Sequence, residues 1–149
     1  MVKKTVTYED YLGGTRTEVF YFNLTEAEVT KFNLQYDGGL LAYLRSIVGK
    51  QNGNAVIKFI EDILKLSYGE KSADGKRLMK SEDIYTEFSE TEAYSKIFVE
   101  LATDAKKFAD FFNNILPKSF REQLSDKEPS AENLDEALIP PTVPGEFEM

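Results

Sequence analysis

The sequence contains neither cysteine nor histidine. Without cysteine the chain has no disulfide bond and no thiolate nucleophile, and without histidine it has no imidazole to act as a general base near neutral pH. The same two absences remove the side chains that hold most zinc ions. The fold must therefore be held together by packing, which suits a reducing compartment.

Long hydrophobic runs are also missing. No apolar stretch approaches the roughly 20 residues that a helix needs to cross a bilayer. The chain starts with MVKKTVTYED, in which no apolar segment follows the basic residues. We therefore expect neither a membrane span nor a signal peptide.

Positive charge is scarce, and the net charge is −8. Residues 126–149 contain seven acidic side chains and one lysine, so they carry −6, while residues 1–125 carry only −2. This balance repels phosphate groups. We expect no nucleic acid and no membrane among the partners.

Aromatic residues are abundant, with 8 Tyr and 11 Phe in 149 residues. This length suits one hydrophobic core, so we predict a single domain over residues 1–125 and an acidic, proline-containing tail over residues 126–149. Proline disfavours regular structure in the tail, which we expect to be flexible. Within it, Leu134 and Leu138 share one face of a short helix suited to docking.

The N-terminal residues favour a β-hairpin. Residues 3–11 and 15–22 are rich in Thr, Val, Tyr and Phe, and Gly13 and Gly14 mark the turn between them. A two-stranded ribbon is marginally stable alone. Two alternatives remain open: the hairpin packs on the chain's own helices, or its edge pairs with another subunit in a homo-oligomer.

Amphipathic helices follow the hairpin. Thr25 and Glu28 form a capping-box pattern at the first helix, which runs to about residue 36. Further helices are predicted near residues 40–48, 54–68, 81–88 and 91–117, with Gly69 ending the third. Asp104 divides the last segment into either one kinked helix or two abutting helices. The predicted fold class is α+β, mainly α, with about five amphipathic helices and an N-terminal hairpin.

Candidate catalytic motifs fail on inspection. Residues 69–77 resemble a phosphate-binding loop, but the glycine spacing is wrong and Arg77 stands where a hydroxyl must hold magnesium. The acidic residues 9 and 10 lie on a predicted strand, where neighbouring side chains point to opposite faces and cannot share a catalytic pocket. The acidic pair at residues 82–83 is explained by the favourable position of acidic side chains at a helix start. The basic residues at 71, 76, 77 and 80 suit a solvated loop, or a contact with an acidic partner or with the chain's own acidic tail. We predict a protein that is not an enzyme and that uses no cofactor or metal.

An apolar stripe dominates residues 91–117. Its residues recur at steps of three and four, which places them on one side of a helix. Such a stripe forms either core or a groove that accepts a partner's amphipathic helix. The predicted partner-binding residues are Tyr94, Phe98, Phe108, Phe111, Phe112, Leu134 and Leu138.

Three blocks of the sequence resemble a family of small tailed-phage proteins, the tail assembly chaperones of siphophage type. The blocks are KKTVTYEDYLGGTRTEVFYFNLTEAEVTKF, LKLSYGEKSADGKRLMKS and EFSETEAYSKIFVELATDAKKFADFFNNILPK. The resemblance covers roughly residues 3–118, and the C-terminal tail lies outside it.

This resemblance implies a non-enzymatic role. A chaperone of this kind would bind the apolar helical stripes of the tape-measure protein until tail tube subunits displace it. The implied partners are the tape-measure and tail tube proteins, and the implied location is the cytoplasm of the infected bacterial host. The alternative is a structural virion protein, a head or tail accessory component that docks on neighbouring subunits.

Overall fold

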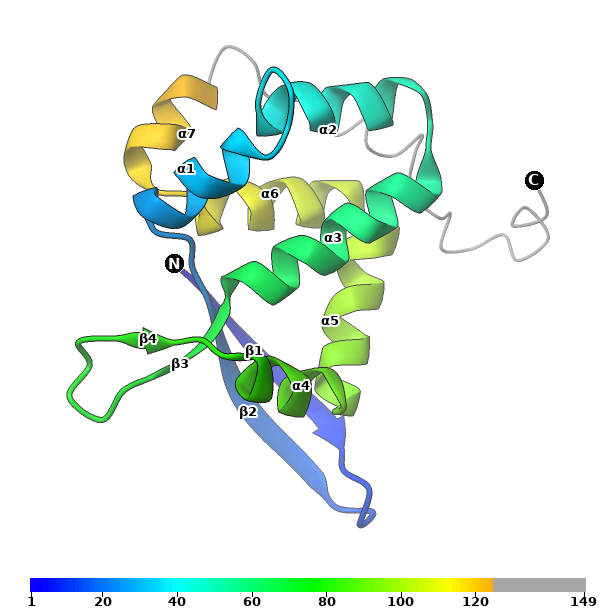
Figure 1. The fold of residues 1–149 in the computed structure, drawn as a ribbon. Coiled ribbons are helices and arrows are strands. Elements are labelled where there is room, and N and C mark those ends of the chain that lie inside the picture. Colours follow the sequence, from blue (N-terminus) through cyan, green and yellow to red (C-terminus); the bar gives the residue numbers. More distant parts are fainter. Residues whose placement is uncertain (125–149) are drawn as a thin grey trace, which may run out of the picture.

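The computed structural model describes residues 1–124. Its strands, shown with the helices in Figure 1, are β1 (Val2–Glu9), β2 (Thr15–Phe22), β3 (Tyr68–Lys71) and β4 (Leu78–Met79). The helices of this part are α1 (Glu26–Leu34), α2 (Leu40–Gly49), α3 (Gly53–Ser67), α4 (Glu82–Ser89), α5 (Glu92–Thr103), α6 (Ala105–Ile115) and α7 (Lys118–Leu124). The predicted tail, with Leu134 and Leu138, lies outside the described residues.

The predicted hairpin is present and belongs to a larger sheet. Strands β1 and β2 pair antiparallel from Val2 opposite Phe22 to Glu9 opposite Thr15. Strand β2 also pairs with β3, which in turn pairs with β4, so the strand order follows the chain. The hairpin therefore gains strands and also packs on α5. In Figure 1 it extends beneath the helices.

The end of α3 corrects one prediction. The sequence pattern assigned Tyr68 to the helix and Gly69 to its C-terminal cap, but the backbone turns extended at Tyr68 and starts β3. Packing explains the change. The Tyr68 ring stacks on Phe88 with 4.0 Å between the ring centroids and contacts Phe22 at 5.6 Å. Burying this ring in the core favours the extended backbone over one more helical turn.

Capping residues fix where the helices begin. Thr25 and Glu28 form the predicted capping box on α1, and Ser81 caps α4 through the main-chain N–H of Ile84. Thr91 caps α5 in the same way. These ends could be read from the sequence because each cap contacts its own helix.

The described residues form seven helices rather than about five. The stripe over residues 91–117 divides at Asp104, which ends α5 and accepts a hydrogen bond from the main-chain N–H of Lys107 in α6 at 3.1 Å. A short α7 follows Pro117. The alternative of two abutting helices is therefore correct, because the Asp104 side chain gives α6 its own start.

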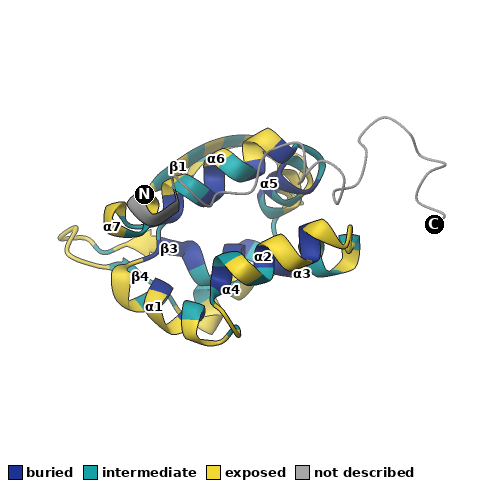
Figure 2. Ribbon diagram, turned by 90° about the horizontal axis from the view of Figure 1, so that it is seen from above, coloured by how far each residue is buried: buried dark blue, intermediate teal, exposed yellow. Residues whose placement is uncertain are grey.

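The hydrophobic core is formed by residues of β1, β2 and β3 together with residues of the helices, chiefly α2, α3, α5 and α6. Figure 2 shows the buried residues facing inward on these helices, while much of α1 is exposed. Aromatic rings make up much of this core, with Phe22, Phe59 and Phe108 at 0 to 1% exposure. The N-terminus lies beside the end of α6, where the Met1 amino group donates to the main-chain oxygen of Asn114.

Candidate partner-binding site

A cleft of about 600 Å³ opens between α1, α3 and α4. Its apolar wall is formed by Phe32 and Tyr36 of α1 and its flank, Leu66 of α3 and Tyr85 of α4. Tyr36, Leu66 and Tyr85 are half-buried, so each keeps apolar surface open to a partner. A half-buried cluster of this kind is typical of a protein-binding surface.

Ring contacts hold the α1 side of the cleft in place. Tyr36 meets Phe32 edge-on with the ring centroids 5.3 Å apart, and it stacks on Tyr43 of α2 at 4.3 Å. Burial is the main cause that raises the pKa of Tyr36. The wall is therefore a preformed surface rather than a set of loose side chains.

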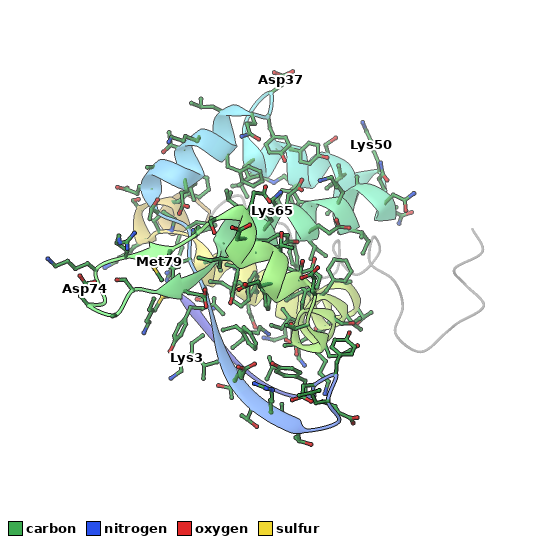
Figure 3. The ribbon with its side chains drawn as sticks, turned by 60° about the horizontal axis from the view of Figure 1, so that its bottom comes forward. Lys3, Asp37, Lys50, Lys65, Asp74 and Met79 are labelled. Carbon is green, nitrogen blue, oxygen red and sulfur yellow. The ribbon has the colours of Figure 1, made fainter. Side chains whose placement is uncertain are left out.

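Charged residues surround the apolar wall. Lys80 Nζ lies 2.9 Å from both carboxylate oxygens of Glu28 and donates to the main-chain oxygen of Asn23 at 2.6 Å. Lys65 of α3 pairs with Glu82 at 3.0 Å, and Figure 3 places Lys65 beside α4. An apolar floor with a charged rim suits the apolar face of an amphipathic helix.

Lys80 differs from its predicted role as part of a solvated basic loop. Its side chain is only 20% exposed and bridges the start of α4 to α1 through Glu28. The two residues are 52 positions apart, so no local pattern could have paired them. The neighbouring Lys71 lies over the ring of Tyr21, with 4.2 Å from Nζ to the centroid.

Tyr94 and Phe98, two of the predicted site residues, continue the aromatic surface. The hydroxyl groups of Tyr94 and Tyr85 are 3.3 Å apart, and the Tyr94 ring stacks on Phe98 at 6.0 Å. Both Tyr94 and Phe98 are half-buried. Burial and the hydrogen bond with Tyr85 raise the pKa of Tyr94. The structure thus joins two predicted residues to the cleft through Tyr85.

The predicted residues of α6 lie in the core. Phe108, Phe111 and Phe112 are at most 3% exposed. Phe111 packs edge-on against Phe22 at 5.2 Å, and Phe112 contacts Phe59 at 5.9 Å. A partner could touch these rings only if α6 moved, and their role in binding stays a prediction.

The sequence alone did not identify Phe32, Tyr36, Leu66 and Tyr85 as site residues. They come from α1 and the residues just after it, from α3 and from α4, and their periodicity looks like that of any core-facing residue. Among residues 1–124 no group of three or more His, Cys, Asp or Glu side chains is arranged to hold a metal ion. In the same described part, no helix is long and apolar enough to span a membrane. The arrangement is suited to covering an apolar surface.

Comparison with known protein families identifies this chain's family. The sequence model described as phage tail assembly chaperone matches residues 1–143 of the 149 residues. No curated protein and no solved structure matches the chain. Because the match spans nearly the whole sequence, the chain belongs to the phage tail assembly chaperone family.

Proposed function

We propose that this protein is a non-enzymatic chaperone that binds the tape-measure protein and helps the tail tube assemble around it. The observation that carries the proposal is the aromatic cleft between α1, α3 and α4, with its charged rim. The cleft offers an apolar surface to the apolar face of a partner helix.

The chemistry of the cleft favours an amphipathic helix as the ligand. Tyr36, Leu66 and Tyr85 supply apolar contact area, and aromatic rings contribute strongly to such contacts. Lys65 and Glu82 on the rim can pair with charges that flank the apolar face of the ligand. A tape-measure chain with apolar helical stripes would be kept from aggregating while these stripes are covered.

Tyr94 and Phe98 extend this surface along α5, and we propose that they contact the same ligand. Leu134 and Leu138 are the proposed contacts of the tail, whose acidic residues would keep the complex in solution by charge repulsion. The protein would act in the cytoplasm of the infected bacterial host and leave before the particle is complete.

Co-expression with the tape-measure protein tests the proposal. The wild-type chain should raise the soluble fraction of the tape-measure protein, and Tyr85→Ala should reduce that gain because the cleft loses a wall. Tyr21→Ala is the matched control, since Tyr21 is a half-buried tyrosine of β2 outside the cleft. Lys65→Glu provides a second variant on an exposed side chain that leaves the core intact. Equal solubility with and without the wild-type chain would contradict the proposal.

The structural virion component remains the second candidate, because β1 presents a strand edge on which a neighbouring subunit can dock. Mass spectrometry of purified particles separates the two functions. A chaperone should be absent or present in traces, whereas many copies per particle would establish the structural role.

A further inference from the structure

Strand β1 is one edge of the sheet, and its outward main-chain groups can be assigned. The N–H of Asp10 donates to the oxygen of Gly14 at 2.8 Å, so main-chain groups of even-numbered β1 residues face β2. The groups of Lys3, Thr5 and Thr7 therefore point away from the sheet. The Thr7 oxygen agrees with this assignment, because it accepts a hydrogen bond from Lys96 Nζ of α5 at 2.9 Å.

Helix α5 runs beside this edge and leaves a groove of about 420 Å³ between them. Lys4 of β1 pairs with Glu100 of α5, and Lys96 pairs with Thr7 one helical turn earlier. Consecutive residues from Val2 to Thr7 line the groove, so it follows the edge itself rather than one face of the strand. Among the described residues, no hydrogen bond from another element occupies the main chain of Lys3 or Thr5.

The two sides of the groove differ in chemistry. On the inner side, Val6 is half-buried next to the buried Ile97. On the outer side, Lys3 and Thr5 are exposed, and Figure 3 shows Lys3 pointing away from the body of the molecule. Three lysines and one glutamate line the groove, which makes it positive on a protein whose net charge is −8.

We propose that the groove between β1 and α5 binds an extended segment of a partner protein in which acidic and apolar residues alternate. The segment adds to β1 as a fifth strand and exchanges hydrogen bonds with the main chain of Lys3 and Thr5. Its apolar side chains face Val6 and Ile97, and its acidic side chains face Lys3. Positive charge at the groove is the reason for an acidic partner. This surface is separate from the cleft and goes beyond the proposed function.

A second copy of the chain fits the edge less well. Pairing β1 with another β1 would place the two strands about 4.8 Å apart, and each strand carries its own α5 alongside. A second copy would bring its own three lysines to the same edge, and repulsion between like charges disfavours that pairing. An acidic segment meets no such repulsion.

Thr5→Pro tests the proposal on the full-length protein. Proline removes the outward N–H of residue 5 but no hydrogen bond between β1 and β2, and proline is tolerated on edge strands. Thr5→Val keeps the N–H and is the matched control. The probe is a fluorescent, end-capped peptide of sequence EVEVEVE, whose binding is followed by fluorescence anisotropy. Thr5→Pro should weaken binding about tenfold, whereas Thr5→Val should bind like the wild type.

Two further measurements make the outcome decisive. Peptide addition should slow hydrogen exchange at the amide of Thr5 relative to the already paired amide of Val6, and the KVKVKVK peptide should bind more weakly. Equal binding of EVEVEVE to the wild type and to Thr5→Pro, or stronger binding of the lysine peptide, would overturn the proposal. So would a dimer in sedimentation experiments that Thr5→Pro dissociates. Thr5→Pro should leave the soluble yield of tape-measure protein unchanged, so the two proposals fail independently.

Discussion

Gly69 shows how one residue can decide where two strands meet. It is buried in β3, and a Cβ atom added there would lie 2.6 Å from Cγ of Leu78 and 2.9 Å from the main-chain oxygen of Met79. Real Cβ atoms do not approach other atoms so closely. Glycine is required here because atoms of the neighbouring strand β4 approach the position closely, not because of its backbone freedom.

Gly69→Ala should therefore lower the free energy of unfolding by roughly 1–3 kcal/mol, as overpacking commonly does. Chemical denaturation followed by circular dichroism measures this change. Gly49→Ala is the control, because Gly49 ends α2 with nothing near its added Cβ. There alanine should be neutral or raise stability by up to about 1 kcal/mol. If Gly69→Ala left the free energy of unfolding unchanged, β4 would not pack closely beside β3 in solution.

Asp10 organises the hairpin turn and links its stability to pH. Its carboxylate is held by Arg16 Nε at 2.7 Å and by the N–H groups of Leu12 and Gly14 at 2.9 Å each. The hydrogen bond from Arg16 is the main cause that keeps the pKa of Asp10 below its ordinary value. The folded state therefore favours the ionised carboxylate.

A lowered folded-state pKa contributes stability above the unfolded pKa, and this contribution disappears as pH falls through the folded pKa. Asp10→Asn should melt at a lower temperature than the wild type at pH 7. The difference should shrink between about pH 5 and pH 2, as the wild-type carboxylate becomes protonated. Arg16→Gln removes the main cause of the lowered Asp10 pKa. The difference in melting temperature between Arg16→Gln and the wild type should therefore shrink over the same pH range. A gap between wild type and Asp10→Asn that stays constant down to pH 2 would refute this account.

At the scale of elements, the junction between α5 and α6 depends on one side chain. Asp104 ends α5, and its carboxylate accepts the hydrogen bond from the main-chain N–H of Lys107 that starts α6. This junction lets the apolar stripe change direction. The α5 part carries the half-buried Tyr94 and Phe98, and the α6 part carries the buried Phe108 and Phe112.

Asp104→Ala should destabilise the protein by about 1 kcal/mol, since the start of α6 loses its cap. Asp104→Asn keeps an oxygen that accepts the same hydrogen bond and should lie close to the wild type. Urea denaturation of the three proteins at neutral pH measures both differences. Equal losses for alanine and asparagine would assign the effect to the charge instead of the cap.

At the scale of the whole molecule, residues 1–124 already bury a connected set of apolar side chains that runs from Tyr8 in β1 to Leu116 after α6. The aromatic contacts join segments far apart in the chain, such as Phe22 of β2 with Phe111 of α6. We therefore predict that the domain expected over residues 1–125 folds without the acidic tail.

A chain that ends at Ser125 should unfold in one cooperative transition, with a change of less than about 1 kcal/mol in the free energy of unfolding, which corresponds to a few degrees in melting temperature. Differential scanning calorimetry measures it. If the tail has its proposed role, the shortened chain should also keep less tape-measure protein in solution. A broad, non-cooperative transition would show that residues beyond 125 belong to the core.

The sequence by itself determined the local features. The capping box of Thr25 and Glu28 and the hairpin could both be predicted, because each rests on contacts between residues close in the chain. The absence of cysteine likewise shows from the sequence alone that these residues form no disulfide bond. The resemblance of three blocks to tail assembly chaperones was confirmed by the family match.

The tertiary structure decided how these pieces meet. Periodicity placed Tyr94 and Phe108 on one stripe, but only packing against other elements left the first half-buried and enclosed the second. Packing also placed Tyr68 in a strand, paired Lys80 with Glu28 and brought Tyr36 and Tyr85 to the same cleft. Burial and pairing of this kind depend on contacts between segments that lie far apart along the chain. No local pattern in the sequence shows which distant segments will come into contact.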